Sequence, residues 1–254
     1  MQKDDSFVDG VLQKRLASFL ALSDEEKSAL TALAAVPSRR LDARRDLVRE
    51  GDTPRTLFLI AEGWACRYKT LEDGRRQIVG ILLPGDLCDL NNLVLSEMDH
   101  SIGTLSAIRY LEIPHEQVAR VTQLLPRLGR AFWWQILTNF SIQREWILNV
   151  GQRNAIERIG HLFCELQVRL TSVGLAERDG YDLPITQIDI ADATGLTPVH
   201  VNRTVQEMRA RGLISLSNRH LGIPDWDKLR ESSMFNPAYL HLHNQRTDDR
   251  GSVA

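Results

Sequence analysis

One stretch of the sequence decides the fold prediction: residues 185–208 read ITQIDIADATGLTPVHVNRTVQEM. Thr186 is placed to cap a short helix, and Gly195 follows that helix where a left-handed backbone ends a helix without penalty. Thr197 then caps a second helix with Pro198 at its first position, where the missing N–H is harmless. Two helices joined by so tight a turn predict a helix-turn-helix.

The second helix has an apolar face and a polar face. Val201, Val205 and Met208 follow at spacings of four and three, so we expect this face to be buried. The remaining side chains point elsewhere and are expected to face DNA. The candidate DNA-binding residues are Thr186, Thr197, Pro198, Val199, His200, Asn202, Arg203 and Gln206. A buried helical hairpin is the alternative, but it would not need polar side chains on its free face.

A wing and a local positive charge follow this motif. The run RGLI at 211–214 ends the helix and starts a strand, residues 218–220 form a polar turn, and residues 221–223 return as a second strand. Residues 197–219 hold four arginines and one glutamate, a local charge of +3 within a chain of net charge −2. A chain with a nearly neutral net charge can therefore still have a basic face suited to nucleic acid.

Length and composition bound the rest of the chain. The 254 residues are enough for two domains, and 43% hydrophobic with 25% charged residues excludes wholesale disorder. The first ten residues show no apolar signal region, and no apolar run approaches the roughly 18 residues of a membrane span. Three scattered cysteines argue against a disulfide framework. We expect a cytoplasmic protein with no membrane contact.

The spacing of apolar residues and turn residues divides the chain into five parts. Residues 1–40 are predicted to be helical. Residues 41–115 carry short apolar runs between turn signals, which predict an antiparallel β-barrel with a type I′ hairpin turn at Asp73-Gly74. Residues 116–150 predict a long helix that needs a partner, with a break at residues 151–154. Residues 151–230 hold a second helix (155–171), a loop (173–183) and the winged helix-turn-helix, and residues 231–254 form a tail.

This α+β plan resembles the Crp/Fnr family of bacterial transcription regulators. The resemblance rests on three features: a series of short motifs in the barrel segment (G-D, L-F-L-I, E-G, D-G-R, P-G-D), the long helix, and a winged helix-turn-helix ending in R-G-L-I. It implies a jelly-roll barrel like that of cyclic-nucleotide-binding domains, and a homodimer formed through the long helix. It also implies binding of a palindromic double-stranded DNA site, allosteric control from the barrel, and RNA polymerase as a partner.

The resemblance also implies roles for individual residues. Arg203 matches the arginine of the family's recognition helix that reads guanine, and Asn202 falls on another base-facing position that could pair with adenine. The family's usual glutamate is Val199 here, which can contact only a thymine methyl group, so the half-site should differ from the family's at that position. Thr186, Thr197 and His200 could contact phosphate.

The sensor departs from the family's pattern for cyclic nucleotides. The Gly-Glu pair that holds the cyclic phosphate is Asp89-Leu90 here, and the later Arg-Ser pair is His100-Ser101. A carboxylate facing a phosphate argues against cAMP. The family's purine-facing positions on the long helix are Asn139, Gln143 and Arg144. These seven residues are the candidate effector pocket, for another ligand or for none.

Other sensor chemistries and other classes of protein find less support. The first 65 residues contain no cysteine for an iron–sulfur cluster, and Cys88 lies among leucines that suggest an inert thiol. We predict no cofactor, no metal site and no enzyme activity, because no catalytic constellation is present. One alternative is a small-molecule or cyclic-nucleotide sensor module without DNA readout. A second alternative, a cupin-like enzyme on the same barrel, would need clustered histidines, which the barrel segment does not provide. The effector, the operator, and the choice between activation and repression stay open.

Overall fold

The computed structural model describes residues 5–95 and 97–242. A jelly-roll of two four-stranded antiparallel sheets forms its sensor part, as predicted. One sheet has the order β1 (Ser38–Leu41), β8 (Ile108–Pro114), β3 (Thr56–Glu62), β6 (Leu87–Cys88). The other has the order β2 (Asp46–Val48), β7 (Ser101–Thr104), β4 (Ala65–Thr70), β5 (Arg76–Leu82). The short 3₁₀ helix η1 (Leu90–Leu93) follows β6.

The turn between β4 and β5 differs from the expected one. The hairpin is present, but Gly74 has a positive φ (85°) and Asp73 does not. The backbone N–H of Gly74 instead donates to the carbonyl of Leu71, at 2.9 Å. The predicted type I′ turn is therefore wrong, because it requires positive φ at both central residues. A longer loop with one left-handed glycine joins the strands.

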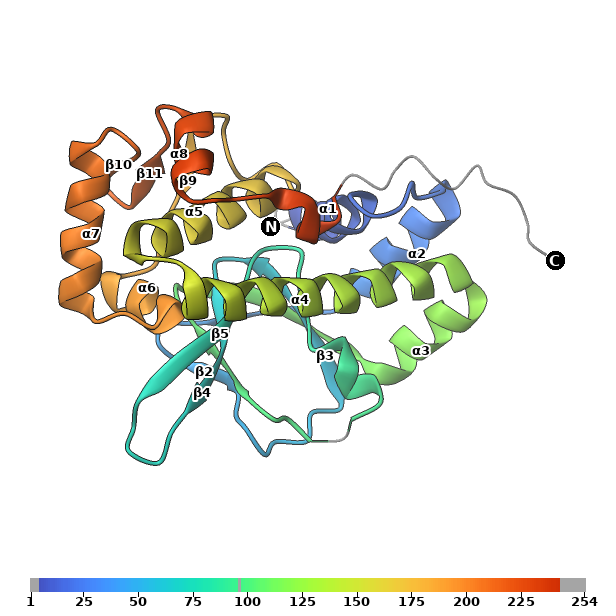
Figure 1. Ribbon diagram of the computed structural model, residues 1–254. Coiled ribbons are helices and arrows are strands. Elements are labelled where there is room, and N and C mark those ends of the chain that lie inside the picture. Colours follow the sequence, from blue (N-terminus) through green and yellow to red (C-terminus); the bar gives the residue numbers. More distant parts are fainter. Residues whose placement is uncertain (1–4, 96, 243–254) are drawn as a thin grey trace.

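Helices lie along one side and one end of the barrel, and α4 runs from that end to the C-terminal domain (Figure 1). The N-terminal helices are α1 (Asp5–Ala17) and α2 (Asp24–Ala34). The single helix expected over residues 116–150 is in fact two, α3 (His115–Leu124) and α4 (Pro126–Gln152). Pro126 forces this break, because a proline disfavours helical geometry in the residue before it, and Leu125 has φ −126° and ψ 80°. The 27 residues of α4 extend about 40 Å along the molecule.

The DNA-binding part begins after a capped break. The side chain of Asn154 accepts hydrogen bonds from two backbone N–H groups and starts α5 (Ala155–Thr171), where the sequence predicted a new helix. The helix-turn-helix follows as α6 (Gln187–Thr194) and α7 (Pro198–Ala210). Its wing is the hairpin of β10 (Ser215–Ser217) and β11 (His220–Gly222). The expected loop at 173–183 contains a third strand, β9 (Gly180–Asp182), which pairs with β11.

The chain then returns across the molecule. Helix α8 (Trp226–Ser232) ends the DNA-binding part, and residues 234–242, which include the 3₁₀ helix η2 (Pro237–Leu240), run back along α4 and α5 (Figure 1). We call residues 234–242 the C-terminal strap. Leu240 in the strap is buried, and Leu242 packs against both the N-terminal helices and the core of the DNA-binding part.

Three apolar clusters hold this arrangement together. One fills the barrel between its sheets, around Ile60 and Ile102. A second joins α1, α2, α3 and the first half of α4 to the outside of the barrel. The third runs from Trp64 and Ile81 on the barrel through Trp146 on α4 into the helix-turn-helix. The DNA-binding part is therefore packed directly on the sensor. No helix within residues 5–95 and 97–242 is long and apolar enough to cross a membrane.

Candidate nucleic-acid interface and sensor core

Each helix of the helix-turn-helix begins at the capping residue that the sequence predicted. Thr186 Oγ1 accepts from the backbone N–H of Asp189 at 3.3 Å, and Asp189 Oδ2 accepts from the N–H of Thr186 at 2.7 Å. Gly195 ends α6 in the left-handed conformation, with φ 66°. Thr197 Oγ1 then accepts from the N–H of His200 at 3.2 Å, with Pro198 at the first position of α7. These caps fix the direction in which α7 leaves the turn.

The two faces of α7 divide as the sequence predicted. Val201, Val205 and Met208 are buried in the cluster that includes α5 and α6. The opposite face is open to solvent, and the exposed candidates on it are Pro198, Val199, Asn202, Arg203 and Gln206. Val199 is 81% exposed, which is unusual for an apolar side chain on a well-packed helix. Arg203 has no hydrogen-bond or ion-pair partner among the described residues. This face is free to meet a ligand.

The barrel reaches the start of α6. Arg44, in the loop between β1 and β2, donates from Nη2 to Asp189 Oδ2 at 2.8 Å and to Thr186 Oγ1 at 3.2 Å. The hydrogen bond to Asp189 raises the pKa of Arg44. Burial by itself would raise the pKa of Asp189, but Arg44 lowers it. A longer contact, Arg76 Nη1 to Asp192 Oδ2 at 3.8 Å, lies nearby. Thr186, a candidate phosphate contact, therefore accepts a hydrogen bond from a barrel side chain in this conformation.

Two residues at the start of α6 were not predicted. Gln187, the first residue of α6, accepts a hydrogen bond at Oε1 from Asn202 Nδ2, at 3.1 Å. Ile188 is 58% exposed at the second position of α6. An isoleucine beside a helix cap would ordinarily be assigned to the core, so its exposure could not be expected from the pattern. The partner of Gln187 depends on how the two helices cross.

In the sensor, the residues in the phosphate-binding position are buried among themselves. Asp89 is 4% exposed and accepts from Arg67 Nε at 2.8 Å, while His100 Nε2 lies 3.2 Å from the same oxygen. Burial would raise the pKa of Asp89, but Arg67 and His100 lower it to about 2. Burial also lowers the pKa of His100, and its contacts with Asp89 and Asp99 raise it above the ordinary value. Arg67 was not predicted, although a lone arginine in the apolar run Ala65-Cys66 was a signal for a buried partner.

The other candidate effector residues have different surroundings. Leu90 is buried in η1, and Ser101 Oγ accepts from the backbone N–H of Glu50 at 3.0 Å. Asn139 lines a cavity of about 20 Å³ beside Asp86, and Gln143 and Arg144 are exposed on α4. The group around Asp89 does not fit a cyclic phosphate, because a resident carboxylate already pairs with the buried Arg67. An added phosphate there would meet like charge.

The surroundings of the cysteines disfavour the thiolate form. Cys66, Cys88 and Cys164 are all buried and unpaired. Burial raises the pKa of Cys66 and Cys164 to about 12 and raises that of Cys88 well above its ordinary value. A thiol that stays protonated is a poor nucleophile.

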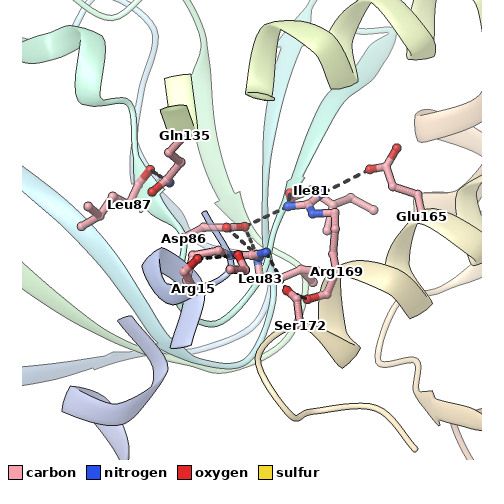
Figure 2. A network of polar contacts seen from close by, with 10 residues as sticks. Arg15, Ile81, Leu83, Asp86, Leu87, Gln135, Glu165, Arg169 and Ser172 are labelled. Carbon is pink, nitrogen blue, oxygen red and sulfur yellow. Dashed lines mark hydrogen bonds and ion pairs between the residues drawn. The ribbon is translucent and has the colours of Figure 1, made fainter. Parts of the chain in front are cut away.

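A polar network joins the sensor to the DNA-binding part (Figure 2). Asp86, in the P-G-D turn of the barrel, lies 2.8 Å from Arg15 Nη2 on α1 and accepts from Arg169 Nη2 on α5 at 2.9 Å. Arg169 Nη1 donates to Glu165 at 3.1 Å. Glu165 Oε2 accepts from Trp146 Nε1 on α4 and from the hydroxyl of Tyr239 in the strap, both at 2.9 Å. Burial would raise the pKa of Asp86, but the two arginines lower it.

A separate groove of about 1220 Å³ lies between α1, α5 and the segment that leads into α8. Lys14, Gln167 and Trp226 are among its lining residues. None of the seven candidate effector residues lines it.

Comparison with known proteins agrees with this architecture. Residues 38–124 match the cyclic nucleotide-binding domain family, and residues 157–232 match the Crp-like helix-turn-helix domain family. The chain is 30% identical over 200 residues to the transcriptional activator protein FnrL of Cereibacter sphaeroides, covering 77% of this chain and 79% of that protein. It is 29% identical to the nitrogen fixation regulation protein FixK of Bradyrhizobium diazoefficiens, covering 69% and 73%.

Among solved structures, FixK2 from Bradyrhizobium japonicum superposes with a TM-score of 0.70 at 21% identity, covering 78% of this chain and 96% of that one. That structure supports the fold, and the sequence relatives support the family. A cyclic-nucleotide-binding-like barrel, a long connecting helix and a winged helix-turn-helix stand in the same order in this chain, which belongs to the Crp/Fnr family of transcription regulators.

Proposed function

We propose that the protein is a homodimer that binds a palindromic DNA operator and regulates transcription under control of its barrel. The observation that carries this proposal is the division of α7. Its apolar face is fully buried, while Val199, Asn202 and Arg203 project into solvent from a helix whose start is fixed by a cap. A helix presented in this way fits the major groove.

Each exposed side chain suits one feature of a base pair. The Arg203 guanidinium matches the O6 and N7 acceptors of guanine, and the Asn202 amide matches N6 and N7 of adenine. Val199 offers only apolar contact, which suits the thymine methyl group. Thr197, Pro198 and His200 surround the start of α7, where backbone N–H groups attract phosphate. Gln206 lies one turn beyond Asn202 and extends the same exposed face.

The exposed side of α4 supports a dimer. Trp133, Leu137, Phe140 and Ile147 are each between 48% and 74% exposed and follow at spacings of four, three and seven residues. This is the spacing of a coiled-coil seam. Two copies paired along α4 would present two recognition helices to successive major grooves, about 34 Å apart.

Control by the barrel is supported by the direct packing of the DNA-binding part on it. Arg44 contacts α6, and the network around Asp86 and Glu165 joins the barrel to α4 and α5. A signal that changes these contacts would shift DNA affinity, typically by about 1–3 kcal/mol. We propose a signal other than cAMP, RNA polymerase as a protein partner, and a cytoplasmic location beside the DNA. We propose no enzyme activity.

The test is a titration at fixed salt against a site enriched from random duplex DNA. Arg203→Ala should weaken binding to that site by about 1–3 kcal/mol and leave binding to scrambled DNA nearly unchanged, because base contacts specify and phosphate contacts do not. Arg209→Ala removes the same charge farther along α7 and serves as the matched control. Equal losses on the enriched and scrambled duplexes for Arg203→Ala would contradict the proposed readout.

A further inference from the structure

One hydrogen bond crosses the helix-turn-helix on its solvent side. Asn202 Nδ2, on α7, donates to Gln187 Oε1, on α6, at 3.1 Å. Asn202 is exposed and Gln187 is half-buried. Gln187 is held at the first position of α6 by the Thr186 cap directly before it. The bond therefore fixes one exposed side chain of the recognition helix from a neighbouring, anchored helix.

The bond joins the Asn202 amide to a second amide, that of Gln187. A carboxamide is nearly symmetric in shape, and a rotation of 180° exchanges its oxygen and nitrogen. In the observed orientation Nδ2 faces Gln187 and Oδ1 faces away from it. The reversed orientation would bring Oδ1 toward Gln187 Oε1 and place two acceptors together. The Gln187 amide would then have to turn as well and present its Nε2 to Oδ1, so the two amides reverse only together. In either orientation the bond ties the Asn202 side chain to α6.

The observed orientation leaves free the groups of Asn202 that a base needs. An amide nitrogen carries two hydrogens, and the bond to Gln187 uses one of them. The second N–H and Oδ1 stay available, and these are the donor and the acceptor with which asparagine reads adenine N7 and N6. Without the bond, the Asn202 side chain could leave this position and would discriminate less between base pairs.

We infer that Gln187 is a positioning residue that holds Asn202 for its base contact and so strengthens the base preference of Asn202. The inference rests on the proposed function, because it concerns how the same helix reads DNA. It places part of the specificity on α6, outside the recognition helix, at a residue that need not contact a base itself.

The test measures base preference at every position of the enriched site for the full-length protein and four variants. Asn202→Ala identifies the base pair that Asn202 reads as the position whose preference it flattens. Gln187→Met keeps the length of the side chain and removes the acceptor. It should reduce the preference at that base pair roughly two- to tenfold, the value of one net hydrogen bond, and leave the base pair read by Arg203 unchanged. Gln187→Glu keeps an acceptor and should retain the preference while weakening binding to all sequences, because it adds negative charge.

The fourth variant, Gln187→Met combined with Asn202→Ala, separates positioning from direct contact. It should match Asn202→Ala alone, because Gln187 acts only through Asn202. Unchanged preferences in Gln187→Met, a further change in the double variant, or the absence of any position flattened by Asn202→Ala would each overturn the inference while leaving the proposed function intact. A wild-type protein with no base preference anywhere would instead overturn the proposed function itself.

Discussion

The buried pair of Asp89 and Arg67 allows a stability prediction with a worked magnitude. Asp89→Asn keeps the size of the side chain and removes the charge that faces a guanidinium 9% exposed. The pKa of Asp89 falls from an ordinary 3.8 to about 2. Each pKa unit corresponds to about 1.4 kcal/mol, so folding favours the charged form of Asp89 by about 2 kcal/mol. Because the variant also leaves Arg67 buried without a counter-charge, we expect a loss of about 2–4 kcal/mol in the free energy of unfolding.

The assay is urea and thermal unfolding followed by circular dichroism at pH 7. The expected loss corresponds to a fall of about 5–10 °C in Tm for a chain of this size. Asp73→Asn is the matched control, because it neutralises an exposed carboxylate in the same barrel and should cost under about 1 kcal/mol. In the double variant with Arg67→Met, the cost should be smaller than the sum of the two single costs.

The pH dependence gives a second readout of the same pair. The folded pKa of Asp89, about 2, lies below the ordinary 3.8, so its stabilisation is complete above pH 3.8 and is lost as the pH falls toward 2. The difference between the wild type and Asp89→Asn should therefore shrink over that interval. A variant as stable as the Asp73→Asn control at pH 7 would refute the assignment of a buried, strongly coupled pair.

Three further outcomes follow from other parts of the molecule. His100 has a raised pKa, so its protonated form stabilises the fold below pH 6.5, and this contribution is lost as the pH rises through the folded pKa. His100→Gln should therefore lower the free energy of unfolding more at pH 6 than at pH 8.5. An NMR titration that gives the His100 imidazole a pKa at or below 6.5 would contradict this. Leu137→Glu should convert a dimer to a monomer in light scattering, while Leu71→Glu, at a similarly exposed leucine on the barrel, should not; a dimer in both would disprove the seam on α4. Arg44→Ala should speed amide hydrogen exchange in α6 because it removes the barrel's contact with the helix cap, whereas Arg45→Ala should not, and equal exchange rates would count against that contact.

The sequence was most informative where structure is set by neighbouring residues. The caps at Thr186 and Thr197 and the left-handed Gly195 each act within about one helical turn, so both helices of the motif could be placed from the sequence. The start of α5 was predictable in the same way from Asn154. The short barrel strands could be recognised as a class from their spacing, although their pairing order could not.

The features that the sequence did not reveal depend on contacts between distant segments. Strand β9 is only three residues long and exists because β11, about forty residues later, pairs with it. Arg67 and Asp89 lie on separate elements, and Arg44 meets Asp189 across 145 residues. The bond between Gln187 and Asn202 requires the crossing geometry of two helices. Local propensity carries no information about such partners, so only the folded arrangement shows them.

The C-terminal strap changes how the DNA-binding part can move. That part is joined to α4 by the break at Arg153–Asn154, and again by the strap, whose η2 packs on α4 and whose His241 Nε2 lies 3.4 Å from Ser141 Oγ on that helix. A body attached by one flexible link can pivot in any direction, whereas a body attached at two separated points keeps a single axis of rotation through both. A signal that releases the barrel's contacts with α5 and α6 while the strap stays packed would therefore leave each recognition helix one angular coordinate along which to turn.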